Sequence, residues 1–167
     1  MRFDAEVEVP TGSRNKYEVD HETGRIKLDR TLFTATAYPC DYGFIPDTLA
    51  EDDDPLDVLV LVEQPTFPGC VISVRPVAVF WMRDEKGPDA KILCVPAGNP
   101  RQDHIQDKDS VAAHLLDEIG HFFQVYKDLE PGKSTDVRGW ENREAAEQVV
   151  EEARQRWRQS QRRSHGG

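Results

Sequence analysis

Four carboxylates fall within six positions of the chain, at Asp52, Asp53, Asp54 and Asp57. An apolar run from Val58 to Val62 follows directly and has the length of a buried strand. Pro55 favours extended backbone at Asp54, and if Asp53 is also extended, Asp52 and Asp54 point to the same side. Oxygen ligands on a rigid element suit hard divalent cations such as Mg²⁺. The segment predicts a metal site, with a solvated acidic turn as the alternative.

A second acidic cluster surrounds a turn between two apolar segments, residues 77–82 and 92–95. Asp84 precedes the Gly87-Pro88 pair and Asp89 follows it, so a hairpin at this point brings the two carboxylates together. Lys91 stands two residues after Asp89 and shares its strand face. A carboxylate and an ammonium group are therefore expected to point into the same space.

The elements that carry these residues are predicted from hydrophobic periodicity. Residues 3–9 alternate as a half-buried strand with Glu8 on the polar face, and Lys16, Glu18 and Asp20 share one face of the next strand. Short strands with turn signals recur through the first two thirds of the chain, which indicates a β-barrel or sandwich. Residues 31–50 show no periodicity.

Two helices are predicted late in the chain. Apolar residues recur at helical spacing from Val111 to Tyr126, with Asp109 or Ser110 as the expected cap. The second helix begins near Asn142 and ends in a group of arginines, which the helix dipole favours at that end. Residues 159–167 are expected to form a frayed tail.

Length and composition bound the class of protein. The chain has 167 residues and a formal net charge of −10, so we expect one domain, residues 1–167, that does not bind nucleic acid. Neither a membrane-spanning stretch nor a signal peptide is recognisable, which predicts a cytoplasmic protein without a membrane partner. The three cysteines lack metal-type spacing and are expected to be reduced thiols.

If the charged strand faces and turns converge on one cavity, negative charge is in excess there. The seven carboxylates are Glu8, Glu18, Asp52, Asp54, Asp57, Asp84 and Asp89, and the four cations are Lys16, Arg30, Lys91 and Lys127. Carboxylates this close to one another require bound cations, so more than one divalent ion is implied. Lysine, arginine and tyrosine beside Mg²⁺ then suit phosphoryl oxygens.

The ordered set of motifs resembles the family I soluble inorganic pyrophosphatases in their compact prokaryotic form. The segment from Asp52 to Val58 fits the signature of that family, and the resemblance covers about residues 3–157. The other matching motifs are Glu8-Val9-Pro10, Lys16-Tyr17-Glu18, Arg30, the run from Tyr38 to Gly43, Asp84 with Asp89 and Lys91, and Tyr126-Lys127.

The resemblance implies an α+β protein, an OB-like five-stranded β-barrel flanked by C-terminal helices, assembled as a homohexamer. It implies hydrolysis of pyrophosphate to two phosphates, by a metal-activated water that attacks phosphorus in line, with several Mg²⁺ ions per active site.

Site residues carry over from the resemblance position by position. Metal ligands are implied at Asp52, Asp57, Asp84, Asp89 and, through water, Glu18. The implied catalytic set is Asp54 as general base, with Lys16, Arg30 and Tyr42, the last of which positions Asp57. Contacts to substrate are implied for Lys16, Arg30, Tyr38, Lys91, Tyr126 and Lys127, and Glu8 is placed in the outer shell.

Two other functions stay open on the residues alone: a Mg²⁺-dependent phosphohydrolase that acts on nucleotides, and a non-catalytic cation-binding or assembly protein. The adjacent residues Phe122 and Phe123 indicate assembly into an oligomer. Because adjacent residues cannot both face one narrow helical stripe, one is expected to pack on the barrel and the other to contact a neighbouring subunit.

Overall fold

A computed structural model describes residues 1–167. Five of its strands close into a barrel in the order β1-β4-β5-β7-β6, and β1 pairs with β6 to complete the ring. These strands are β1 (Phe3–Val9), β4 (Asp41–Ile45), β5 (Leu56–Val60), β6 (Val71–Asp84) and β7 (Gly87–Pro96). The pairing of β5 with β7 is parallel and the others are antiparallel. The predicted five-stranded OB-like barrel is therefore confirmed.

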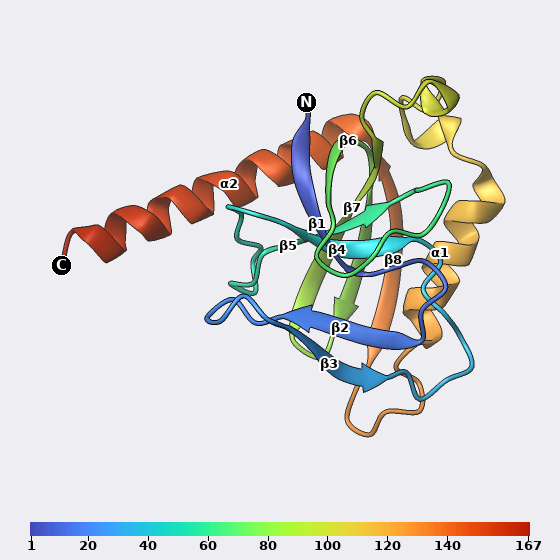
Figure 1. The fold of residues 1–167 in the computed structure, drawn as a ribbon, viewed down its shortest axis with the longest axis horizontal. Helices are drawn as coiled ribbons and strands as arrows, with labels where there is room; N and C mark the ends of the chain where they lie inside the picture. The colour runs from blue at the N-terminus through green and yellow to red at the C-terminus, as the bar shows by residue number, and fades with distance from the viewer.

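The remaining elements surround this ring (Figure 1). Strand β8 (Thr135–Asn142) adds to β6 outside the ring, and β2 (Asn15–Val19) and β3 (Ile26–Thr31) form a separate two-stranded sheet. Helices α1 (Ala113–Val125) and α2 (Arg143–His165) lie in the last third of the chain and cover different parts of the barrel. Neither helix combines the length and the apolar composition that a membrane span requires.

The hydrophobic core has two parts, because each of the two helices packs against a different side of the barrel. One cluster joins the barrel to α1 through Ile119, Phe122 and Phe123, and the other joins it to α2 through Ala146, Val150 and Ala153. The buried residues of β1 alternate, as the sequence predicts, whereas β5 is apolar at nearly every position because both of its faces are covered.

Strand β4 could not be predicted from hydrophobic periodicity, because a buried acid and a glycine interrupt its alternation of polar and apolar residues. Gly43 pairs with Val7 of β1, and a side chain there would place its Cβ 1.9 Å from the carbonyl oxygen of Glu6. Only glycine permits this close approach of β1 and β4.

Asp41 is the buried acid of β4, and we predict that it stabilises the fold. Its Oδ1 accepts from the N–H and hydroxyl of Thr11, and its Oδ2 accepts from the N–H and hydroxyl of Thr66, so it joins two loops. Removing the buried acceptor of four partly buried bonds leaves donors unpaired, and Asp41→Ala should lower the free energy of unfolding by about 3 kcal/mol. Urea denaturation measures this loss. Thr66→Val, which removes only one of the four donors, should cost about 1 kcal/mol.

Two expectations about α1 are wrong. Ala112 occupies the N-cap position without a side-chain bond, because Asp109 and Ser110 belong to a separate 3₁₀ turn that Val111 ends in extended conformation. Phe122 and Phe123 are both buried within the chain, so neither is exposed for the contact with a neighbouring subunit that the sequence suggests.

The aromatic residues around α1 explain this burial. Phe122 packs against Tyr38 and Tyr126, and Phe123 packs against Tyr42 and Phe80, with ring centroids 4.7 to 6.0 Å apart. The barrel and the end of α1 thus cover a wider arc of the helix than one narrow stripe.

Helix α2 begins where predicted, with the Asn142 side chain accepting from the N–H of Ala145. It continues to His165, through the segment expected to fray. The hydroxyls of Ser160 and Ser164 donate to carbonyls of preceding turns, and Arg162, Arg163 and His165 lie in the last turn, where the helix dipole favours cations. This end of α2 extends away from the barrel (Figure 1).

Candidate active site

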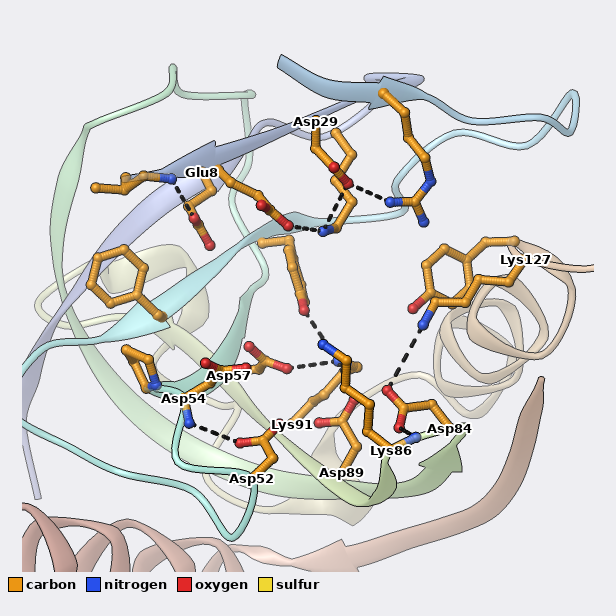
Figure 2. A pocket seen from close by; sticks show the side chains of 18 of the residues that line it. Glu8, Asp29, Asp52, Asp54, Asp57, Asp84, Lys86, Asp89, Lys91 and Lys127 are labelled. Carbon is orange, nitrogen blue, oxygen red and sulfur yellow. Dashed lines mark hydrogen bonds and ion pairs between the residues drawn. The ribbon is translucent and has the colours of Figure 1, made fainter. Parts of the chain in front are cut away.

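A cavity of about 440 Å³ opens between the barrel, the β2–β3 hairpin and the end of α1 (Figure 2). Only four of its 21 lining residues are hydrophobic. Thirteen of the fourteen predicted site residues line it: Glu8, Lys16, Glu18, Arg30, Tyr42, Asp52, Asp54, Asp57, Asp84, Asp89, Lys91, Tyr126 and Lys127. The fold thus gathers residues that are far apart in the sequence into one strongly polar cavity.

Tyr38 is the predicted site residue that the structure does not bring to the cavity wall. Its ring is buried, with centroids 4.7 Å from Phe122 and 5.4 Å from Tyr42. It supports the residues behind the wall, and a contact of Tyr38 with substrate stays a prediction.

The acidic turn before β5 differs from the extended backbone that the sequence suggests. Asp53 has φ of 65°, in the left-handed region, and the N–H of Asp54 donates to Asp52 Oδ1 over 3.1 Å. The condition for placing Asp52 and Asp54 on one side of a strand therefore fails. Both still line the cavity, because the tight turn rather than strand alternation directs them there (Figure 2).

Lys91 is the buried cation at the centre of the acidic wall. Its Nζ lies 2.9 Å from Asp57 Oδ2 and 3.0 Å from Asp89 Oδ2, and it donates to the Tyr42 hydroxyl over 3.1 Å. Asp57 faces Lys91 because the two residues are paired in the parallel register of β5 and β7. Burial works against the charged ammonium, but Asp57 and Asp89 more than offset it and raise the pKa of Lys91 well above its usual value.

The carboxylates of this wall fit a hard cation. Burial raises the pKa of Asp52 and of Asp89, and the proximity of Asp54 to Asp52 and of Asp57 to Asp89 adds to the effect. Lys91 offsets only part of this effect at Asp89, so further positive charge beside Asp52 and Asp89 would favour their ionised forms. The donors are all oxygen, the ligand type of Mg²⁺ rather than of softer metals, and Asp57 and Asp89 are held on strands. In this structure no three acidic, histidine or cysteine side chains stand close enough together to hold a metal ion by themselves.

The opposite wall carries cations held by acids, of which sequence reasoning missed Asp29 and Glu85. Arg30 donates to Asp29, Lys16 pairs with Glu18 and Asp29, and Lys127 lies 3.6 Å from Glu85 and 3.8 Å from Asp84. Partial burial raises the pKa of Glu85. A hydrogen bond from its own backbone N–H and the side-chain ammonium groups of Lys127 and Lys133 outweigh burial and lower that pKa to about 2. The one sequence feature that could have indicated Glu85 as a site residue is its position between Asp84 and Asp89.

His21 and Lys86 also line the cavity. His21 is exposed, as a turn residue should be, yet its ring packs edge-on against Phe44 with centroids 5.0 Å apart. Lys86 occupies the turn between β6 and β7, where its N–H donates to Asp84 Oδ1 and its ammonium has no ion pair.

Glu8 gives the site a pH dependence. Burial, with a smaller contribution from Asp57, raises the pKa of Glu8 to about 7, although its Oε2 accepts from the N–H of Val19. An acid with a raised pKa in the folded state destabilises that state as pH rises from its unfolded pKa, 4.5, to about 7. A shift of this size corresponds to roughly 3 kcal/mol.

We therefore predict that Glu8→Gln, which keeps the acceptor for Val19, removes this loss. Without divalent metal, the free energy of unfolding of the variant should exceed that of the natural protein by about 2 to 3 kcal/mol at about pH 8 and by little at about pH 5. Urea denaturation at the two pH values measures the difference. A constant difference across pH would show that Glu8 does not titrate in this range.

Comparison with known proteins agrees with this geometry. The family model described as inorganic pyrophosphatase matches residues 5–158. An inorganic pyrophosphatase of Streptomyces coelicolor is 56% identical over 158 residues, which are 95% of this chain and 97% of the relative. One of Methanosarcina acetivorans is 57% identical, over 90% of this chain and 89% of the relative.

Solved structures give the same result. The inorganic pyrophosphatase of Thermus thermophilus superposes with a TM-score of 0.92 at 51% identity, covering 94% of this chain and 91% of that one. The enzyme of Helicobacter pylori has a TM-score of 0.92 at 41% identity, covering 94% of each chain. The chain belongs to the inorganic pyrophosphatase family, the enzymes that hydrolyse pyrophosphate to phosphate.

Proposed function

We propose that this cavity hydrolyses pyrophosphate with Mg²⁺ as the metal. The observation that carries the proposal is the division of one cavity into an acidic wall at Asp52, Asp57 and Asp89 and a basic wall at Lys16, Arg30 and Lys127. Such a cavity suits an anion bound together with hard cations.

The residues that would hold the metal are Asp52, Asp57, Asp84 and Asp89, with Glu18 reaching it through water. Mg²⁺ bound there would lower the pKa of water and neutralise charge on the phosphoryl oxygens. Asp57 and Asp89 share the ammonium of Lys91, which keeps these two carboxylates in place beside the cavity.

Asp54 accepts the proton of the attacking water, since it lines the cavity beside Asp52 and is exposed to solvent. Arg30, Tyr126 and Lys127 hold the phosphate that leaves, and Lys16 and Lys91 hold the phosphate that is attacked. The buried phenol of Tyr42 accepts from Lys91, which also pairs with Asp57, and burial raises the pKa of Tyr42 so that it stays protonated. Glu8, which also lines the cavity, accepts from the N–H of Val19 and so ties β2 to β1.

Substrate choice separates this proposal from a nucleotide phosphohydrolase and from a binding protein. Phosphate release should be fast from pyrophosphate and slow from nucleoside triphosphates, because the cavity of about 440 Å³ offers charged groups and few apolar surfaces for a base. Preference for triphosphates would support the nucleotide enzyme. Metal binding without phosphate release from either would support the binding protein.

We also propose the oligomeric state and the cellular compartment of the enzyme. The family resemblance supports a cytoplasmic homohexamer, and the three free cysteines agree with a reducing compartment. Light scattering should then give about six times the 19.0 kDa of one chain. The mass of a single chain at micromolar concentration would contradict assembly.

A further inference from the structure

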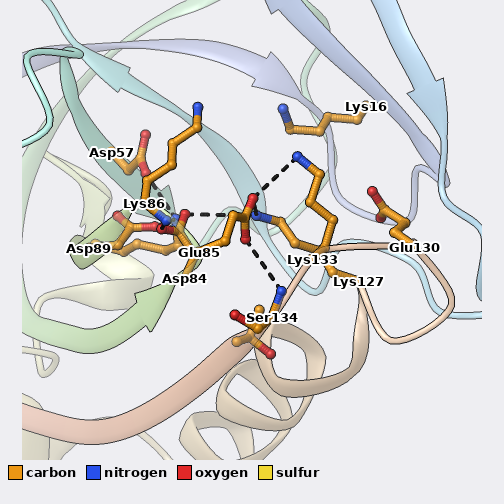
Figure 3. A network of polar contacts seen from close by, with 12 residues as sticks. Lys16, Asp57, Asp84, Glu85, Lys86, Asp89, Lys127, Glu130, Lys133 and Ser134 are labelled. Carbon is orange, nitrogen blue, oxygen red and sulfur yellow. Dashed lines mark hydrogen bonds and ion pairs between the residues drawn. The ribbon is translucent and has the colours of Figure 1, made fainter.

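Glu130 is a buried acid that lies behind the cavity wall, in the turn that follows α1 (Figure 3). Its side chain is only 6% exposed. It does not line the cavity, in contrast to the acids that would hold metal. A carboxylate taken out of water in this way needs a partner, and its partners show what it does.

The partner is Arg30, one of the cations of the basic wall. Nη2 of Arg30 donates to Glu130 Oε2 over 3.1 Å, and Nε lies 2.9 Å from Oε1, although it lacks the alignment of a hydrogen bond. The other edge of the guanidinium donates through Nη1 to Asp29. Two acids thus hold the plane of Arg30 from two sides, and a two-point contact of this kind fixes orientation as well as position.

Glu130 also holds the segment that carries Lys127. The N–H of Glu130 donates to the carbonyl oxygen of Lys127 over 2.9 Å, which closes the turn after Tyr126. Arg30 comes from β3 and Lys127 from the end of α1, so nothing in the local chain sets the distance between them. Glu130 contacts both, one through its side chain and the other through its backbone.

We propose that Glu130 is a positioning residue: it sets the orientation of Arg30 relative to Lys127, so that both cations meet the same phosphate. The inference rests on the proposed pyrophosphate hydrolysis. The negative charge of Glu130 weakens the attraction between the cavity and an anionic substrate. Any benefit of Glu130 to substrate binding must therefore come from the orientation that it gives to Arg30. An arginine that is already fixed loses less conformational freedom when substrate binds.

The test is a double-mutant cycle of Glu130→Gln and Arg30→Gln, with KM and kcat for pyrophosphate measured at saturating Mg²⁺. Glu130→Gln should raise KM by about five- to tenfold while kcat changes by less than about threefold, because Arg30 stays charged but is held by Asp29 alone and loses its fixed orientation. In the Arg30→Gln background, Glu130→Gln should change KM by less than about twofold, since the residue through which it acts is absent. Asp117→Asn, an exposed acid of α1 without an ion pair, controls for the change in net charge and should leave KM unchanged.

Three results would overturn the inference: an unchanged KM in Glu130→Gln, a lower KM, or the same increase with and without Arg30. A lower KM would show that Glu130 masks Arg30 rather than orienting it. Thermal unfolding of each variant checks the fold, and Glu130→Asp, which keeps the charge on a shorter side chain, should show a smaller increase in KM with the same dependence on Arg30. If the natural protein does not hydrolyse pyrophosphate, the proposed function fails instead, and the two failures are therefore distinguishable.

Discussion

Asp54→Asn should lose between about 10² and 10⁴ of its turnover of pyrophosphate, because the substitution keeps the shape of the side chain and removes the proton acceptor. Asp54 lies in an exposed turn, so its replacement should leave the free energy of unfolding almost unchanged. The measurement is kcat across the pH range at saturating Mg²⁺, with thermal unfolding in parallel.

Asp53→Asn is the matched control for this variant. Asp53 stands beside Asp54 in the same turn but does not line the cavity, and asparagine tolerates its left-handed backbone. The control should keep most of the natural kcat. Near-natural kcat in Asp54→Asn would remove Asp54 from the role of general base.

Lys91→Gln should lower both stability and activity, and added Mg²⁺ should restore part of the stability. The Lys91 side chain is 1% exposed, so its removal leaves Asp57 and Asp89 close together without their cation. Breaking a buried ion pair from one side costs about 3 to 5 kcal/mol, and the partial exposure of Asp57 places the expected loss nearer 3 kcal/mol in the presence of a chelator.

Urea denaturation with chelator and with saturating Mg²⁺ measures this prediction. A divalent ion bound at Asp57 and Asp89 would supply the missing positive charge, so the loss should shrink with Mg²⁺ while kcat stays low, because a substrate contact is gone. Lys86→Gln, which removes an exposed cavity lysine without an ion pair, should not alter stability. A loss in Lys91→Gln that Mg²⁺ does not reduce would argue against metal at this wall.

Part of the site could be predicted from local physical logic, whereas Tyr42 and Tyr126 entered as implications of the family resemblance. Asp89 and Lys91 share a strand face, and Asp84 lies near them across the β6–β7 hairpin, as predicted. The turn itself falls at Glu85 and Lys86, whereas Gly87 and Pro88, which were predicted to form it, begin β7. The closed order of the barrel strands is a long-range property, and it entered as an implication of the family resemblance rather than from periodicity.

The errors came from features that no local pattern specifies. The left-handed backbone of Asp53 appears only in the folded turn, and the burial of both Phe122 and Phe123 depends on an aromatic surface supplied by distant strands. Glu130 and Arg30 are 100 residues apart, and an acid followed by Pro131-Gly132 has the sequence of an ordinary surface turn. Strand β4 lacked alternation because a buried acid and a glycine interrupt it.

The central claim is that the acidic wall works with a bound divalent metal to hydrolyse pyrophosphate. The initial rate of phosphate release from pyrophosphate by the natural protein, with Mg²⁺ and with excess chelator, tests it most directly. We predict rapid release with Mg²⁺, loss of nearly all activity with chelator, and recovery when Mg²⁺ is restored. Phosphate release that is absent with Mg²⁺, or that continues undiminished in chelator, would contradict the account.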